Sequence, residues 1–422
     1  MGYRFRAAIS ALSLALVAVG LITFGSPSGQ PAPSSTGPHF ASVKGLNYGI
    51  PLGLDGRWIG TTWLRSGTGV KDNWNVAYPQ IVADLDFVQQ RHLGRVIRLF
   101  IGLDQLMEWN DGTGFIGFHE GSLANFQQMV SLFAARDLQM VAVLYDQEET
   151  SSPGNFHFEA LDGQHAEMRA GYLRATQAFM ARFGSEPAIV AWDLFNEAYG
   201  SLGPDAGHPP PPAGDPISPN FPDSIVHGFL HDLYSAAKAA APHSWLTVSD
   251  GNLYVQPAPD LSRFDDILDF YDLHIYEDHP ALRELRRRLD KPFILGEAGA
   301  SLKGDHLHDQ RIEATAVRDF LDQAIGSGAL AVLMHSISDQ NLFLATHDRL
   351  TPAGEVLSSF SGQASGRAKW PIVSGPGSTV LFVKQERTRS LTVLHASAAG
   401  ATIRPGGKDR WNRGSWPYLP SG

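Results

Sequence analysis

The sequence predicts an α/β fold, a (β/α)8 TIM barrel followed by a small C-terminal β appendage. Short apolar segments alternate with longer amphipathic segments from Val43 onward, and eight of the short segments have the composition of strands. Fully apolar strands that alternate with helices are typical of a parallel sheet covered by helices, and eight repeats favour closure into a barrel. Long irregular connections follow the third and fourth strands, at 146–163 and 198–223. Loops in these positions build the active-site face of a barrel.

The eight predicted strands are short runs of apolar residues, which we place at 43–48, 95–101, 139–145, 188–195, 245–249, 270–276, 292–297 and 329–336. Apolar residues at i, i+3, i+4 and i+7 predict helices at 78–94, 123–137, 168–184, 224–240, 309–326 and 350–362. An open doubly wound sheet is the alternative. No G-x-G-x-x-G or G-x-x-x-x-G-K-[ST] loop follows an early strand, which counts against it.

The chain divides into three predicted regions. Residues 1–38 contain Arg4 and Arg6 near the start. A run of 18 apolar and small residues follows at 7–24, and then a Pro/Ser/Gly-rich spacer. This pattern is typical of a signal peptide or of an uncleaved anchor that would tether the protein to a membrane. We therefore expect a secreted, periplasmic or cell-envelope protein. Residues 39–362 form the barrel, and 366–422 form a small β-rich region with nine Lys or Arg against two Asp or Glu.

The composition excludes several classes of function. The chain has 422 residues and a formal net charge of −10, which does not favour a nucleic-acid partner. It has no cysteine, so disulfides, thiol catalysis and cysteine-ligated zinc are excluded. The composition leaves the oligomeric state open.

Two glutamates stand at the ends of predicted strands. Asn196 and Glu197 end the fourth strand, and Glu297 ends the seventh. These strands lie across the mouth of a barrel from each other, so the two carboxyl groups can converge. Hydrolysis of a glycosidic bond needs such a pair, one acid and one ionised group, and a separation of about 5–5.5 Å leads to retention of configuration.

Three further polar residues lie on predicted strands. Arg98 lies within the apolar run 95–101, where an unpartnered charge would cost several kcal/mol. It therefore needs a carboxylate inside the barrel, and Glu297 is a suitable partner. His274 and Tyr276 are two residues apart and share one face of the sixth strand.

These residues give the sequence a family resemblance. Arg98, Asn196-Glu197, His274-x-Tyr276 and Glu297, together with the segment RLTPAGEVLSSF, resemble clan A glycoside hydrolases. The chain is most similar to family 5, which holds cellulases and β-mannanases, over about residues 43–362. The resemblance implies a retaining β-glycosidase that acts on a β-linked oligo- or polysaccharide.

The resemblance also implies a role for each residue. Glu197 is the general acid/base and Glu297 the nucleophile. Asn196 binds the 2-hydroxyl of the sugar, and Arg98 and Tyr276 orient Glu297. For His274, a contact with substrate and a purely packed core histidine both stay open.

The sequence departs from family 5 at two strand ends. A histidine usually stands near the end of strand three, where this chain has Tyr145-Asp146. A tryptophan usually stands at the end of strand eight, where this chain has MHSISDQN. These departures leave glucan and mannan, and endo and exo action, undecided.

Aromatic residues that follow strands are candidates for stacking against sugar rings, and those we single out are Trp63, Trp109 and Tyr199. We expect no cofactor and no metal. A silent barrel that only binds saccharide, or that serves as a scaffold in the cell envelope, is the alternative function. A metal-dependent barrel hydrolase is disfavoured because the chain lacks an early H-x-H motif.

Overall fold

The structure is a computed structural model, and it describes residues 37–48, 64, 73–110, 114–146, 160–161, 166–199, 221–250, 264–275, 282, 289–299, 310–335, 345–346, 349–361, 380–385 and 391–396. The chain divides into two compact units, residues 1–34 and 35–422, and every described residue belongs to the second. None of the helices among the described residues is long and apolar enough to cross a membrane. The apolar run at 7–24 lies outside the described residues.

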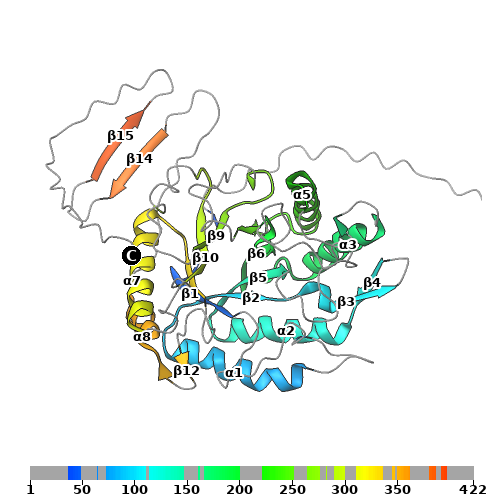
Figure 1. Ribbon diagram of the computed structural model, residues 1–422, viewed down its shortest axis with the longest axis horizontal. Coiled ribbons are helices and arrows are strands. Elements are labelled where there is room, and N and C mark those ends of the chain that lie inside the picture. Colours follow the sequence, from blue (N-terminus) through cyan, green and yellow to red (C-terminus); the bar gives the residue numbers. More distant parts are fainter. Residues whose placement is uncertain are drawn as a thin grey trace, which may run out of the picture. The chain divides into compact units, whose positions relative to one another are not determined.

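The main sheet is a barrel of parallel strands (Figure 1). Its segments follow the order β7-β6-β5-β2-β1-β11-β10-β9-β8. Of these, β7 (Leu246–Thr247) and β8 (Ser249–Asp250) are two halves of one strand, separated only by Val248. Because β7 pairs with β6 and β8 pairs with β9, this strand closes the ring. The others are β1 (Lys44–Tyr48), β2 (Val96–Phe100), β5 (Gln139–Tyr145), β6 (Ile189–Phe195), β9 (Tyr271–Ile275), β10 (Phe293–Ala298) and β11 (Val332–Met334).

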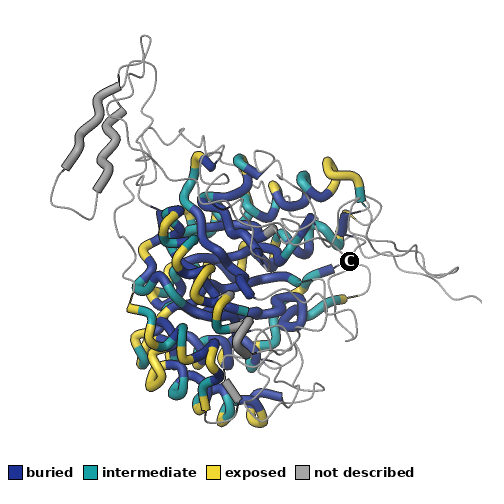
Figure 2. The backbone as a smooth tube through the Cα atoms, turned by 60° about the vertical axis from the view of Figure 1, so that its left-hand side comes forward, coloured by how far each residue is buried: buried dark blue, intermediate teal, exposed yellow. Residues whose placement is uncertain are grey.

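Six described helices cover the outside of these strands (Figure 1). They are α1 (Trp74–Gln90), α2 (Glu120–Ala135), α3 (Ala166–Phe183), α5 (Asp223–Ala240), α7 (Gln310–Ser327) and α8 (Pro352–Ser359). The strands are buried along nearly their whole length, whereas the helices alternate between buried and exposed residues (Figure 2). The predicted (β/α)8 barrel is therefore confirmed.

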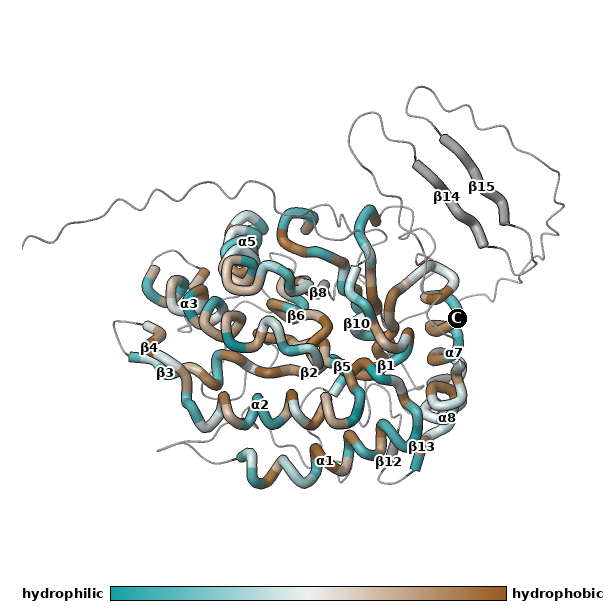
Figure 3. The backbone as a smooth tube through the Cα atoms, turned by 180° about the vertical axis from the view of Figure 1, so that it is seen from behind, coloured by the Kyte–Doolittle hydropathy of each residue, from teal (hydrophilic) through white to brown (hydrophobic). Residues whose placement is uncertain are grey.

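Each helix forms because one of its faces is apolar. In α1, Ala77, Ile81, Leu85 and Val88 recur every three or four residues and are all buried. The last helix, α8, begins with a side-chain cap, since Thr351 Oγ1 accepts a hydrogen bond of 3.2 Å from Gly354 N and Pro352 occupies the first turn. Figure 3 shows apolar residues concentrated on the strands and recurring at intervals along the helices.

The interior of the barrel consists of layers with different chemistry. One buried cluster is apolar and includes Val96, Val141, Ala191, Phe270 and Ile294, together with Phe40. Side chains two residues further along a strand point to the same face. Two residues beyond four of these positions stand Arg98, Asp193, Asp272 and Gly296. An apolar layer therefore lies below a layer of buried charges.

The structure differs from the predicted elements in three places. The last barrel strand is Val332–Met334, shorter than the predicted 329–336, because Ala329 N still donates to Ala324 O at the end of α7. A hairpin that we did not predict, β3 (Met107–Asn110) and β4 (Gly114–Phe118), follows the 3-10 helix η2 (Leu103–Leu106). Its strands are too short to give a clear alternation in sequence. A further short pair, β12 (Ala345–Thr346) and β13 (Arg349–Leu350), precedes α8.

The C-terminal region contains one described hairpin. β14 (Val380–Gln385) pairs antiparallel with β15 (Leu391–Ala396). These two strands match the β structure predicted within 366–422. The region's proposed boundaries stay predictions.

Candidate active site

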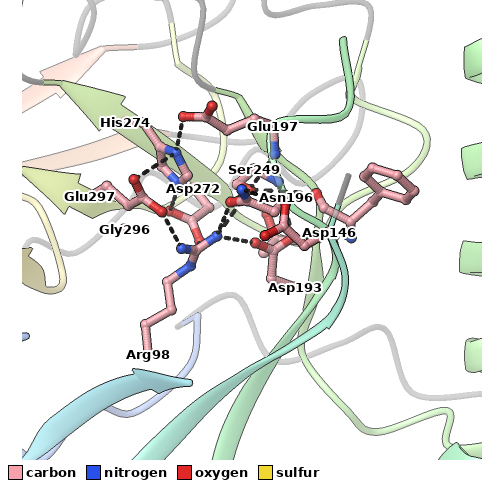
Figure 4. A network of polar contacts seen from close by, with 12 residues as sticks. Arg98, Asp146, Asp193, Asn196, Glu197, Ser249, Asp272, His274, Gly296 and Glu297 are labelled. Carbon is pink, nitrogen blue, oxygen red and sulfur yellow. Dashed lines mark hydrogen bonds and ion pairs between the residues drawn. The ribbon is translucent and has the colours of Figure 1, made fainter. Parts of the chain in front are cut away.

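The two predicted catalytic glutamates approach each other at the mouth of the barrel (Figure 4). Glu297 lies on β10, and Glu197 comes two residues after the end of β6. His274 on β9 stands between them. Its Nδ1 lies 2.6 Å from Glu197 Oε1 and 3.6 Å from Glu297 Oε2. One oxygen of each carboxylate and one ring nitrogen of His274 lie within 4.8 Å of one another.

Local backbone irregularities determine the direction of both glutamate side chains. On β10, the register shifts between Leu295 and Glu297 against β9, which is the mark of a β-bulge. Without the bulge, Glu297 would point opposite to Gly296, so the bulge re-aims its side chain. At the end of β6, Glu197 has a positive φ of 45°, a left-handed conformation that is uncommon for glutamate. Its backbone N donates to Ser249 Oγ at 3.1 Å.

Arg98 is the centre of the buried charge layer. It is fully buried on β2, and its Nη1 donates to Glu297 Oε1 at 2.6 Å. Its Nη2 donates to Asp193 Oδ2 at 2.6 Å and to Asn196 Oδ1 at 2.7 Å. Burial lowers the pKa of Arg98, but the negative charges of Glu297, Asp193 and Asp272 outweigh that effect and raise it overall. Arg98 therefore stays charged and favours the ionised form of Glu297.

Asn196 is held at both ends of its amide. The oxygen accepts from Arg98, and Nδ2 donates to Asp146 Oδ1 at 3.2 Å. Asp146 follows β5, where the family 5 resemblance leads one to expect a histidine. Its neighbour Tyr145 instead turns toward the helix layer, where its hydroxyl lies 3.0 Å from Thr176 Oγ1 on α3. Asp146, not Tyr145, is thus the residue of this strand end that contacts the site.

The sequence prediction missed four polar residues of the site. Asp193 and Asp272 are fully buried beneath the glutamates, and Asn47 and Ser249 donate or accept hydrogen bonds within the same cluster. The signal was present in the sequence. Asp193 and Asp272 each interrupt an apolar strand, and the argument that a buried charge needs a partner, applied to Arg98, applies equally to them.

The pKa values of two site residues depart from their ordinary ranges. Burial lowers the pKa of His274, but the charge of Glu297 and the hydrogen bond to Glu197 raise it to about 9 overall. Burial raises the pKa of Asp272 to about 7, although the charge of Arg98 opposes this. Near neutral pH, His274 is therefore a cation, and Asp272 gains or loses a proton easily.

The predicted aromatic platforms take different positions. Trp109 on β3 packs against Tyr172 of α3, with ring centroids 5.3 Å apart. Tyr199 is 3% exposed, contacts Phe264 edge-on, and its hydroxyl lies 3.1 Å from His227 Nδ1. These are packing contacts of the two rings, and the role of Trp109 and Tyr199 in stacking against sugar stays a prediction. Trp63 and Tyr276 lie outside the described residues, as does most of the strand-eight end after His335.

Among the described residues, Glu197, His274 and Glu297 are also close enough for a divalent cation to fit between them. Each of them already has a partner in the cluster, since Glu297 pairs with Arg98 and His274 pairs with Glu197. The roles that the resemblance implies for these side chains need no metal, and they stay predictions.

Comparisons with solved structures find barrels of the same fold. The β-mannanase from the blue mussel Mytilus edulis matches 79% of this chain and 99% of its own, with 12% identity and a TM-score of 0.55. The β-1,4-mannanase from the sea hare Aplysia kurodai matches 78% and 96%, with 15% identity and a TM-score of 0.55. A GH5_18 protein from Streptomyces cattleya, solved with Manβ1-4GlcNAc, matches 74% and 78%, with 15% identity and a TM-score of 0.54.

No family model and no curated protein matches the sequence. The structural likeness therefore establishes the fold.

Proposed function

We propose that the protein is an exported retaining β-glycoside hydrolase that cleaves a β-linked oligo- or polysaccharide by double displacement. The observation that carries the proposal is the approach of Glu197 and Glu297 across the barrel mouth, with Arg98 bound to one and His274 between them. Their close approach supports retention, since inverting enzymes need about 6.5–9.5 Å between the carboxyl groups.

In the first step, Glu297 Oε attacks the anomeric carbon and forms a covalent glycosyl ester. Glu197 gives its proton to the leaving glycosidic oxygen and becomes a carboxylate. Arg98 supports the attack, because its ion pair keeps Glu297 ionised and holds it in a single orientation.

In the second step, Glu197 takes a proton from a water molecule, whose oxygen attacks the anomeric carbon. The ester bond to Glu297 breaks, and both glutamates return to their starting states. Asn196 points its Nδ2 away from Arg98, and this group is placed to donate to a sugar hydroxyl while Asp146 fixes the amide.

The substrate proposal starts from the neighbouring structures, several of which are β-mannanases. We therefore place β-mannan first in a panel that also contains β-glucans and aryl β-glycosides. The Pro/Ser/Gly-rich segment after the apolar run at 7–24 supports export. N-terminal sequencing of the mature protein from the producing cell would distinguish a cleaved signal from a retained anchor.

The decisive experiment combines product analysis with two variants. The wild-type protein is expected to release a β-configured product, observed by NMR before the anomers equilibrate. Glu297→Gln should abolish turnover. Glu197→Gln should lower kcat about 10²–10⁴-fold on substrates with poor leaving groups and much less on activated aryl glycosides, which need no acid.

The matched control is Glu120→Gln, because Glu120 is exposed on α2 and pairs with Arg182, which is not part of the buried charge layer. Its activity should equal that of the wild-type protein. A Glu297→Gln variant that stays folded and keeps near-native turnover would reject the assignment. Saccharide binding without hydrolysis on the whole panel would favour the silent barrel.

A further inference from the structure

Three buried polar groups face one another beneath the catalytic glutamates without a hydrogen bond among the described residues. Both carboxylate oxygens of Asp272, Nε of Arg98 and Nε2 of His274 are in this position. Asp272 Oδ2 lies 3.7 Å from Arg98 Nε, and Asp272 Oδ1 lies 3.9 Å from His274 Nε2. A buried carboxylate without hydrogen bonds is costly, so its presence at this position calls for an explanation.

The backbone makes room for Asp272. It precedes His274 by two residues on β9, so both side chains point into the barrel. Across from it, Gly296 on β10 has no side chain, and the nearest atoms that a Cβ there would meet all belong to the Asp272 carboxyl group. The glycine that precedes Glu297 therefore leaves the space that the carboxyl group of Asp272 fills.

The charges around Asp272 come from four strands. Arg98 faces it from β2, Asp193 from β6, Glu297 from β10 and His274 from its own strand. Asp272 thus lies between two cations. Arg98 pairs with the nucleophile Glu297, and His274 contacts the acid/base Glu197. Asp272 touches neither of the two catalytic glutamates through a hydrogen bond, but it adjoins a partner of each.

We propose that Asp272 is a positioning residue of the reaction centre, which acts through His274 by keeping the imidazole charged and oriented toward Glu197. This inference rests on the proposed function, because it assigns Glu197 the role of proton donor. An ionised Asp272 stabilises the imidazolium of His274, whose Nδ1 contacts Glu197 and holds that carboxyl group in place. Orientation of a histidine by a buried carboxylate on one nitrogen, while the other nitrogen contacts the reacting group, is an established arrangement.

The pH at which each group titrates fits this role. The pKa of Asp272 is raised by burial to about 7, and that of His274 is raised to about 9 despite its burial. Above neutral pH, Asp272 is therefore ionised while His274 is still a cation. In this range the charge of Asp272 keeps His274 protonated and oriented toward Glu197.

The first test is the variant Asp272→Asn, which keeps the volume and removes the charge. We expect the alkaline limb of the kcat/KM profile to move about one pH unit lower, so that activity at pH 8 falls roughly tenfold. At pH 5.5 the activity should stay within about threefold of wild type, and KM should hardly change, because Asp272 does not touch substrate.

The matched control is Asp84→Asn. Asp84 is equally buried, but it accepts from Tyr48 and Gln80 on the outer side of β1, away from the glutamates. This variant should lose stability and keep the wild-type pH profile. If Asp272→Asn behaves in the same way, Asp272 has only a structural role and the proposal is wrong.

A second variant covers the case in which Asp272→Asn does not fold. The exchange Asp272→Ala with Gly296→Ala puts a methyl group into the space that the carboxyl group leaves. A folded double variant should show the same shift of the alkaline limb. An unchanged limb in this variant contradicts the proposal.

A third measurement does not depend on hydrolysis and separates this inference from the proposed function. In protein labelled with 15N-histidine, with the His274 signal identified by its loss in His274→Asn, the titration midpoint of His274 should fall in Asp272→Asn. An unchanged midpoint rejects the coupling even if the protein is an active glycosidase. A lowered midpoint in a protein that hydrolyses nothing supports the coupling and rejects the glycosidase.

Discussion

The backbone of Glu197 is strained at the position where the proposed chemistry needs it. Its φ of 45° places a glutamate in the left-handed region, and its backbone amide donates to Ser249 Oγ. A non-glycine residue costs about 1–2 kcal/mol in that conformation. The strain directs the carboxylate toward His274 instead of toward the continuation of the strand.

Two variants at this residue should measure the strain. Both Glu197→Gly and Glu197→Ala remove the carboxylate, but only glycine adopts a positive φ without cost. We expect the glycine variant to be more stable than the alanine variant by about 1 kcal/mol in urea unfolding. Equal stabilities would mean that the backbone at 197 relaxes when the side chain is removed.

Some features of the site can be predicted from the sequence, and others cannot. Arg98, Asn196, His274 and Glu297 are indicated because they are polar residues in or at the end of apolar strands, and the structure brings them together. The bulge at Gly296 and the left-handed backbone of Glu197 were not predictable. Both depend on contacts between strands far apart in the chain.

At the scale of elements, the β3–β4 hairpin packs on α3 through one glycine. A Cβ at Gly171 would meet Trp109 Cζ3 at 2.7 Å and Phe115 N at 3.1 Å. The hairpin thus lies flat against the helix only because position 171 has no side chain. Sequence patterning found α3 but missed this hairpin, since strands of four or five residues provide little periodicity.

Helical glycines with different surroundings provide a direct test. Gly171→Ala should destabilise the protein by about 1–3 kcal/mol, because the steric conflict exceeds the gain in helix propensity. Gly228 lies on α5, and the nearest atom that a Cβ there would meet is Arg169 Nη2 at 3.7 Å, an ordinary contact. Gly228→Ala should therefore stabilise by about 0.5–1 kcal/mol in thermal or denaturant unfolding. The same sign for both substitutions would contradict this account of the hairpin.

The hydrogen bond between Asn196 and Asp146 joins the ends of the neighbouring strands β6 and β5. Asp146→Ala removes the acceptor of Asn196 Nδ2 and leaves the other end of the amide bound to Arg98. We expect a higher KM and a lower kcat for saccharide, about 10-fold in kcat/KM, because a misoriented amide loses part of its hydrogen bond to the sugar. An unchanged kcat/KM, measured beside the Glu120→Gln control, would show that Arg98 alone orients Asn196.

For the whole molecule, the titration of buried groups predicts how stability depends on pH. Burial raises the pKa of Asp104 and of Asp272 from 3.8 to about 7, so the folded state holds these protons more tightly than the unfolded state. Stability from these two groups is therefore lost as pH rises from about 4 to 7. The raised pKa of His274 adds stability below about pH 6.5 that is lost as pH rises toward 9.

All three groups act in the same direction, so the melting temperature should be higher at pH 5 than at pH 8. In Asp104→Asn the free energy of unfolding should fall less steeply with pH, by up to about 1.4 kcal/mol per pH unit between pH 4 and 7. Thermal unfolding across this range checks the prediction. A melting temperature that rises from pH 5 to pH 8 would contradict it.

The closing of the barrel has a consequence for the protein while it is being synthesised. β1 pairs with β2 on one side and with β11 on the other, and Lys44 Nζ also donates to the carbonyls of Leu357 and Ser358 at the end of α8. At about 5–20 residues per second, a ribosome needs roughly 10–50 s to advance from β2 to β11. During that time, one edge of the first strand has no neighbour to pair with. A nascent chain of this protein is thus open to mispairing, or available to a chaperone, until nearly the whole barrel has been made.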